Sequence, residues 1–156
     1  MAGKVKAIPE GYQVLTPYLV CNDAARAIEF YKKVLGATEK MRMPAPDGKV
    51  AHAELQFGSS QLMLADESPD MGYRGPQAFG GSPVGLHLYV DDVDTVFKRA
   101  ISAGAKERQP LENKFYGDRS GTIEDPFGHV WSLSTHVEDV SPEEMERRAA
   151  ATFAQS

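Results

Sequence analysis

Apolar and polar residues follow the same order twice along the chain, and each copy begins with an alternating strand. The first copy opens with PYLVCNDAARAIEFYKKVLGA at Pro17, and the second with HLYVDDVDTVFKRAISAGA at His87. In both segments an acidic turn is followed by apolar residues at helical spacing. This spacing predicts a helix of about three turns. Gly36 and Gly104 follow the two helices, where a residue that tolerates positive φ is favoured. The pattern predicts a strand–helix unit in each half of the chain.

Three strand-like runs follow each predicted helix. In the first half they are ATEKMRM, VAHAELQF and SQLMLA, separated by the turn sequences PAPDG and GSS. In the second half they are AKERQPLE, DRSGTIED and HVWSLSTH, with PFG as the last turn. Each half therefore reads β-α-β-β-β, over residues 12–66 and 84–136. Two such halves predict an α+β fold with a mixed sheet inside and helices outside.

Three segments lie outside these two modules. Residues 1–11 form an N-terminal arm, and residues 67–83 are rich in glycine and proline and too long for a simple turn. We interpret the middle segment either as a linker or as a flap over a site. The third segment, residues 137–156, carries the signals of a C-terminal helix.

In this tail, Ser141 is placed to cap the helix, Pro142 suits its first position, and Glu144 would complete a capping box. Met145 and Phe153 belong to an apolar stripe at i, i+4 spacing. That stripe is expected to pack on this domain or on a second subunit.

Composition narrows the functional classes. A formal net charge of −5 argues against a nucleic-acid surface, which needs clustered Lys and Arg. No apolar run is long enough to span a membrane, and the N-terminal residues lack the apolar core of a signal peptide, so we expect a cytoplasmic protein. The single cysteine, Cys21, excludes an internal disulfide and a multi-cysteine zinc site. Phosphate-binding loops, dinucleotide fingerprints, HExxH motifs and nucleophile elbows do not occur.

With AIEFYKKVLGA in the first half and VDDVDTVFKRAISAGA plus DPFGHVW in the second, residues 12–136 resemble the vicinal-oxygen-chelate superfamily of glyoxalases, bleomycin-resistance proteins and dioxygenases. TPYLV, HAEL, LMLADE and FYGDRSGTIEDPFGHVWSL are similar to its PhnB-like branch. The resemblance implies a single domain of paired βαβββ modules, whose curved mixed sheet surrounds a cavity with the helices outside. It also implies a homodimer. In catalytic members, His, Glu or Gln side chains from the first and last strands of each half hold one divalent ion.

The resemblance places those four ligand positions on residues that bind metal poorly. They fall on Gly85, on Leu15 (or on Thr16 if the register shifts by one), on Met63 and on Ser132. Glycine and leucine offer no donor, and a thioether suits soft ions rather than hard divalent ones. We therefore expect no metal and no other cofactor at the usual position, while a displaced divalent metal stays an open alternative.

The last predicted strand contains two histidines. Alternation places His129 and Trp131 on the helix side, so we expect His129 to belong to the preceding turn rather than to a metal site. His136 has cavity-side parity but lies at the end of the strand, so we expect a surface or interface role, with a role in the site as the alternative.

A second set of polar residues shares the predicted cavity side. His52 and Glu54 alternate with small residues, and we interpret them as a catalytic acid–base pair. His87 and Tyr89 point the same way on their strand and are predicted to bind ligand together with Glu124. We expect His52, Glu54 and His87 to converge with Glu124. The alternatives are a relocated metal held by these His and Glu side chains, or ordinary solvated polar residues.

The loop NKFYGDRSG supplies further candidates. Phe115, Tyr116 and Arg119 are predicted to bind ligand, because fixed aromatic rings and a guanidinium suit planar or anionic molecules. The alternative is an ordinary surface ion pair of Asp118 with Arg119, and for Asp118 we favour that interpretation.

These residues lead to one main functional hypothesis and two alternatives. The first is a metal-free protein that binds a small organic molecule, with Leu15, Pro17, Leu19 and Met63 as apolar cavity residues. The second is a glyoxalase-like lyase or isomerase that uses a relocated metal or the His52–Glu54 pair. A scaffold that works through its tail helix is the third. The expected partners are a small molecule and a second copy of the chain, with no nucleic acid and no membrane.

Overall fold

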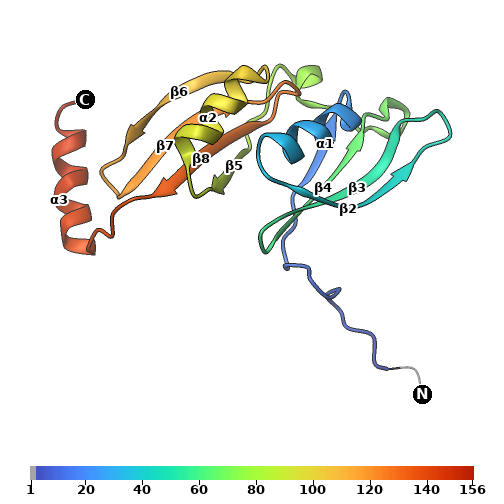
Figure 1. Cartoon of the computed structure of the whole chain (residues 1–156), viewed down its shortest axis with the longest axis horizontal. Coiled ribbons are helices and arrows are strands. Elements are labelled where there is room, and N and C mark those ends of the chain that lie inside the picture. The colour runs from blue at the N-terminus through green and yellow to red at the C-terminus, as the bar shows by residue number, and fades with distance from the viewer. Residues whose placement is uncertain (1–2) are drawn as a thin grey trace. The chain divides into compact units, whose positions relative to one another are not determined.

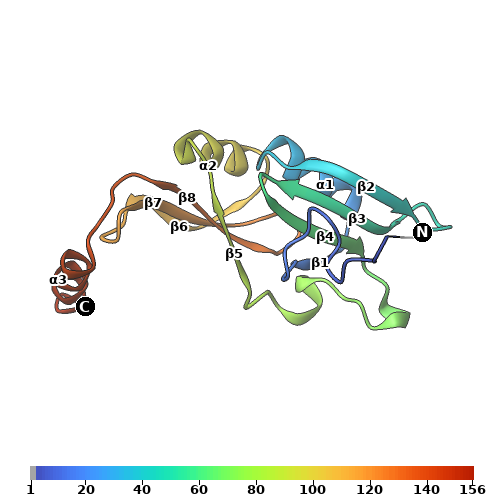
Figure 2. The ribbon, with the colours of Figure 1, turned by 90° about the horizontal axis from the view of Figure 1, so that it is seen from below.

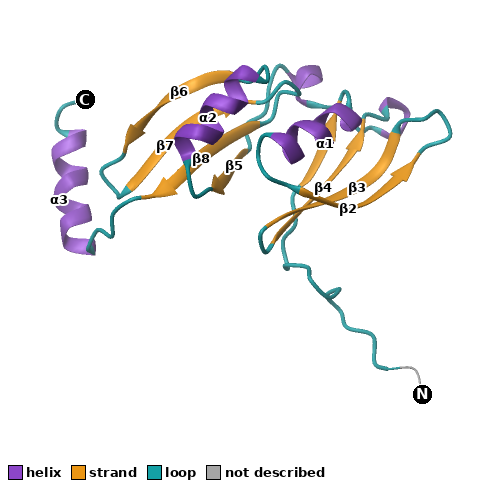
Figure 3. Ribbon diagram, viewed as in Figure 1, coloured by secondary structure: helices purple, strands orange, loops and turns teal. Residues whose placement is uncertain are grey.

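The computed structural model describes residues 3–156 and divides the chain into two compact units, one up to Gly80 and one from Gly81. Figure 1 labels their elements, and Figure 3 distinguishes helices, strands and loops.

The first unit is a four-stranded mixed sheet with one helix. Its order is β1-β4-β3-β2, in which β1 runs parallel to β4 and the other neighbours are antiparallel. Its elements are β1 (Tyr18–Cys21), α1 (Ala24–Lys33), β2 (Thr38–Pro44), β3 (Val50–Phe57), β4 (Ser60–Asp66) and the short 3₁₀ turns η1 (Pro69–Met71) and η2 (Pro76–Phe79).

The second unit repeats this topology and adds a helix. Its order is β5-β8-β7-β6, with β5 parallel to β8. Its elements are β5 (Gly85–Tyr89), α2 (Val93–Ser102), β6 (Lys106–Asn113), β7 (Asp118–Glu124), β8 (Val130–His136) and α3 (Pro142–Phe153). The predicted α+β fold of two βαβββ modules is confirmed, and neither sheet closes into a barrel.

In each module the helix begins at an aspartate and buries one apolar face. Asp23 accepts a hydrogen bond from the backbone N–H of Arg26 (3.1 Å), and Asp92 accepts from that of Thr95 (3.2 Å). The predicted stripe of α1 is buried throughout: Ala24, Ala27, Ile28, Tyr31, Val34 and Leu35. Figure 2 shows α1 and α2 each lying along one face of the sheet of its own module. The opposite face of each sheet is therefore not covered by the helix of its own module.

The DPFGHVW segment owes its pattern to the buried carboxylate of Asp125. It accepts hydrogen bonds from the backbone N–H groups of Phe127 (2.9 Å) and His129 (3.0 Å) and from the indole N–H of Trp131 (2.9 Å). His129 is itself buried in this turn, as expected. The motif thus fixes the turn from β7 into β8, and neither Asp125 nor His129 belongs to the polar face.

The tail helix α3 begins as predicted but is fixed by arginines. The Ser141 hydroxyl accepts from the N–H of Glu144 (3.2 Å), and Pro142 occupies the first position. The Glu144 carboxylate pairs with Arg147 and Arg148, and this holds the pKa of Glu144 at about 2. Arg148 also pairs with Glu138 (2.7 Å), which ties α3 to the segment that follows β8. Within residues 3–156, no helix has both the length and the apolar run that crossing a bilayer requires.

Candidate functional site

In the first module, strand pairing collects polar groups on the face opposite α1. Tyr18 of β1 lies beside Met63 of β4, which lies beside Glu54 of β3. The intervening positions face the helix, where Leu19 and Leu64 are buried.

On this face four side chains form a continuous hydrogen-bonded chain. The His52 Nε2 atom lies 3.1 Å from Glu54 Oε1, and His52 Nδ1 lies 2.9 Å from the Tyr18 hydroxyl. Tyr12, from the segment before β1, donates its hydroxyl to the other oxygen of Glu54. We call this Tyr12–Glu54–His52–Tyr18 series the polar chain of the first module. The predicted His52–Glu54 pair is therefore in direct contact, and sequence reasoning missed both tyrosines.

The polar chain has a preferred arrangement of protons. An ionised carboxylate accepts hydrogen bonds at both oxygens, so Glu54 is best satisfied when Tyr12 and His52 Nε2 both donate to it. In a neutral imidazole, Nδ1 is then an acceptor, which receives the Tyr18 hydroxyl. Burial, and secondarily the neighbouring Tyr73, raise the pKa of Tyr18, so this phenol keeps its proton near neutral pH.

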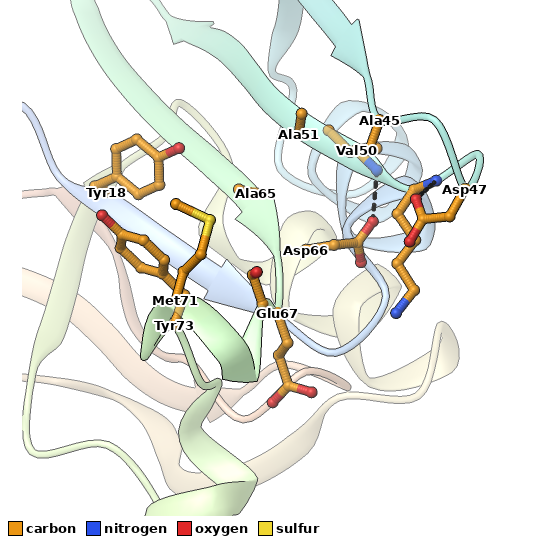
Figure 4. A pocket seen from close by; sticks show the side chains of 12 residues that line it. Tyr18, Ala45, Asp47, Val50, Ala51, Ala65, Asp66, Glu67, Met71 and Tyr73 are labelled. Atoms are coloured by element: carbon orange, nitrogen blue, oxygen red, sulfur yellow. Dashed lines mark hydrogen bonds between the residues drawn. The ribbon is translucent and has the colours of Figure 1, made fainter.

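Tyr18 also lines a pocket of about 370 Å³ within the first module. Figure 4 shows Tyr18, Met71 and Tyr73 grouped at one end of it, and Asp47 and Asp66 at the other. Asp66 is occupied by backbone groups, since it accepts from the N–H of Ala24 (2.8 Å) and from that of Val50 (2.7 Å). At the aromatic end, a ligand would meet the hydroxyls of Tyr18 and Tyr73 and the sulfur atom of Met71. Met71 and Tyr73 come from the 67–83 segment.

The predicted register of β1 was wrong. Leu15, Pro17 and Leu19 were expected on the polar face, but Leu19 is buried on the helix side and Leu15 is 86 % exposed. Parallel pairing with β4 sets the frame, because it places Tyr18 beside Met63. This is the frame in which Thr16, rather than Leu15, corresponds to the metal-ligand position.

In the second module the predicted parity of β5 agrees with the structure. His87 pairs with Ser132 and Tyr89 with Ser134, while Leu88 pairs with the buried Leu133 on the helix side. The rings of His87 and Tyr89 lie 4.8 Å apart.

A buried carboxylate connects this strand to the end of β8. Asp118 is 4 % exposed, accepts from the Tyr89 hydroxyl (2.7 Å), and lies 2.8 Å from His136 Nδ1. Burial acts to raise the pKa of Asp118, but the hydrogen bonds to His136 and Tyr89 prevail and lower it. Hydrogen bonds to Asp118 and Asp139 raise the pKa of His136. The Tyr89–Asp118–His136 cluster is the main polar group of this module.

The interpretation of Asp118 as the surface partner of Arg119 was wrong. Arg119 instead pairs with Asp94 of α2, at 2.7 Å through two nitrogens, on the helix side of the sheet. Alternation along β7 could have revealed this, since residues 118 and 119 must face opposite sides.

Of the other candidates in this module, Tyr116 lies near the cluster: after the hydrogen bond to Asp118, burial and the Asp118 charge, it contributes to the raised pKa of Tyr89. Phe115 packs edge-on against Tyr116 and against Phe153 of α3, so the Phe115 ring borders the tail helix. Glu124 shares the polar face with His87 and is ion-paired with Arg108.

Comparison with known proteins gives the family. The model of the Glyoxalase/Bleomycin resistance protein/Dioxygenase superfamily matches residues 13–133. This chain belongs to that superfamily. An uncharacterized protein of Mycobacterium bovis is 47 % identical over 135 residues, which cover 85 % of this chain and 89 % of the relative.

Two solved structures are similar to this chain in fold. The crystal structure of TioX from Micromonospora sp. ML1 is 29 % identical and covers 80 % of this chain and 99 % of its own, with a TM-score of 0.63. A PhnB protein from Bacillus cereus, a putative 3-demethylubiquinone-9 3-methyltransferase, is 19 % identical, covers 79 % and 99 %, and has a TM-score of 0.63. At that identity the second likeness concerns the fold alone.

The residues at the superfamily's metal positions do not fit a hard divalent ion. Met63 offers a thioether, Gly85 offers no side chain, and Ser132 offers a hydroxyl that lies 3.3 Å from the Thr122 hydroxyl. Thr16 supplies at most another hydroxyl. Throughout residues 3–156, His, Cys, Asp and Glu side chains form no group of three or more arranged to hold a metal ion.

Proposed function

We propose that this superfamily member binds a small planar organic molecule in the pocket beside Tyr18 and does so without a divalent metal. The observation that carries the proposal is the replacement of all four metal-ligand positions by Thr16, Met63, Gly85 and Ser132. A chelating site needs three or four nitrogen or oxygen donors that converge, and these residues do not supply them.

The character of the pocket supports an apolar, planar ligand. Its volume of about 370 Å³ suits a drug-sized molecule. Tyr73 offers a flat apolar surface with a polar tip, and Met71 offers a polarizable side chain that adapts to different shapes. Both are exposed, Met71 by 74 % and Tyr73 by 50 %. In this proposal, residues 67–83 act as the flap rather than as a plain linker.

Calorimetric titration with a panel of planar aromatic compounds tests this function. We expect 1:1 binding that is unchanged by a chelator, and about tenfold weaker binding after Met71→Ala or Tyr73→Ala. Phe79→Ala is the matched control, because Phe79 belongs to the same segment and is 72 % exposed but lies outside the pocket lining. Binding that requires zinc, nickel or manganese, or that ignores Met71 and Tyr73, would refute the proposal.

A second candidate function is a glyoxalase-like lyase or isomerase in which His52 and Glu54 act as an acid–base pair. The direct contact between these side chains favours it. Turnover of 2-oxo compounds or hemithioacetals that disappears in His52→Gln would support this function. Absence of turnover across such a panel would rule out this second function and leave ligand binding as the proposed function.

Three finer properties are part of the proposal. Membership of the PhnB-like branch is supported by the TPYLV, LMLADE and DPFGHVWSL stretches and by the fold of the Bacillus cereus protein. We also propose a homodimer and a cytoplasmic location, as the composition and the resemblance imply.

A further inference from the structure

The polar chain of the first module ends inside the pocket. Of its four members, Tyr18 lines the pocket beside Met71 and Tyr73. Figure 4 shows the Tyr18 ring at the aromatic end of this pocket. The ring also packs at 5.5 Å, centroid to centroid, on the His52 imidazole. A ligand held at this end would therefore meet a hydroxyl that is already bonded to a base.

The order of these groups is that of an activated hydroxyl. Tyr18 donates to His52 Nδ1 at 2.9 Å, and His52 is oriented by Glu54 at 3.1 Å from its other nitrogen. A hydroxyl, a base and a carboxylate that fixes the base's tautomer make up the general logic of a catalytic triad. Because Tyr18 uses its proton toward His52, its oxygen lone pairs remain to accept a proton from the ligand.

We propose that Tyr18 is the acid–base residue of this pocket and that His52 and Glu54 position and relay its proton. The proposal rests on the ligand-binding function of the same pocket. The ligand class it requires is a planar hydroxyaromatic molecule, whose ring packs against Tyr73 and Met71 while its O–H faces the Tyr18 oxygen.

The step is balanced without any further reactant. The ligand O–H bond breaks and its proton joins the Tyr18 oxygen, while the original Tyr18 O–H bond breaks and that proton joins His52 Nδ1. The ligand becomes a phenolate, Tyr18 remains a phenol, and His52 becomes an imidazolium beside the Glu54 carboxylate. Tyr12 holds the second oxygen of that carboxylate in place.

4-Nitrophenol is a suitable probe, because its phenolate and its phenol absorb light at different wavelengths. At a pH where the free probe is mostly neutral, we expect the bound probe to have a ratio of phenolate to phenol about tenfold higher than the free probe, which corresponds to one pH unit. ¹⁵N NMR of histidine-labelled protein should show His52 becoming doubly protonated as the probe saturates the pocket.

Variants separate the relay from the pocket. Tyr18→Phe keeps the ring and should bind the probe without phenolate enrichment, and His52→Gln should do the same. Tyr73→Phe is the control, since it removes a hydroxyl from the same end of the pocket but outside the polar chain, and should retain the enrichment. Enrichment that persists in Tyr18→Phe would overturn the proposal.

4-Nitroanisole distinguishes the two levels of the argument, because it has the same shape and lacks the acidic proton. If neither compound binds, the proposed function and the relay both fail. If both bind and 4-nitrophenol ionises no more readily than in solution, the relay alone is wrong.

Discussion

Gly121 in β7 marks the place where α2 packs most tightly on its sheet. A Cβ atom added there would lie 2.7 Å from Cε2 of Phe97 in α2. It would also lie 3.1 Å from the backbone nitrogen of Leu111 and 3.2 Å from the carbonyl oxygen of Gln109. The Phe97 ring is buried and the other two atoms are backbone of the irregular part of β6, so none of them can move away freely.

The expected cost of Gly121→Ala follows from these distances. Carbon atoms in contact normally lie about 3.5–4.0 Å apart, so the ring and the strand must separate by about 1 Å. Such overpacking typically costs about 1–3 kcal/mol. Against this, replacing glycine restricts the unfolded chain and contributes about 0.4–1 kcal/mol of stability.

Gly85→Ala is the matched control in the same module. Gly85 lies in β5, where an added Cβ meets nothing within 4 Å. Both variants gain the same unfolded-state effect, so the difference between their free energies of unfolding isolates the overpacking and should be about 1–3 kcal/mol. Urea unfolding followed by the fluorescence of the buried Trp131 measures both. Equal stabilities for the two variants would refute the packing of α2 against β7 described above.

Three further predictions concern the second module. Asp118 has a lowered pKa and His136 a raised one, so their joint stabilisation is complete only between the ordinary pKa values of the two groups, pH 3.8 and pH 6.5. The stability lost in His136→Asn should therefore shrink as the pH rises through the pKa of the folded histidine. Urea titrations that show the same loss at every pH would contradict this. Arg148→Met removes the hydrogen-bonded ion pairs with Glu144 and Glu138 that fix α3. Amide hydrogen exchange should then accelerate across residues 142–153 while β8 stays protected. Unchanged exchange would mean that the apolar stripe alone holds the helix. The double variant Gly85→His and Ser132→Glu introduces two metal-ligating side chains and should strengthen zinc binding, measured by calorimetry, at least about tenfold. If zinc affinity does not increase, these positions do not correspond to the superfamily's metal ligands.

The architecture could be predicted because it depends on local, repeated patterns. The apolar stripes of α1 and α2, their aspartate caps and the glycines after them lie within a few residues of one another. Alternation in β5 and β8 likewise reports which side chains face the helix, since Leu86 pairs with Trp131 and Leu88 with Leu133 on that side. Such signals can be read without knowledge of distant contacts.

The contacts that the sequence did not predict join residues that are widely separated along the chain. The frame of β1 is set by parallel pairing with residues 63–66, about 45 positions later, and four residues of alternating character do not fix it alone. Tyr12 reaches Glu54 across 42 positions, and Arg119 reaches Asp94 across 25. Asp118 is a case where a sequence neighbour of opposite charge suggested a pair that the strand geometry forbids.

Comparing equivalent positions in the two modules explains why shared topology does not give shared chemistry. The pairing of Tyr18 with Met63 in the first module corresponds to that of His87 with Ser132 in the second, because Met63 and Ser132 hold the same superfamily position.

From those anchors, Glu54 and His52 of β3 correspond to Thr122 and Ser120 of β7. The first module therefore assembles a tyrosine, a histidine and a carboxylate within hydrogen-bonding distance. The second has hydroxyl groups at those positions: the Thr122 hydroxyl lies 3.3 Å from the Ser132 hydroxyl, and Ser120 accepts from the Ser134 hydroxyl at 2.8 Å. Its buried Asp118 lies two residues before Ser120 on the same strand. Because the strand topology is the same in both modules, the capacity to move a proton depends on three side chains of the first module, and the fold alone does not specify it.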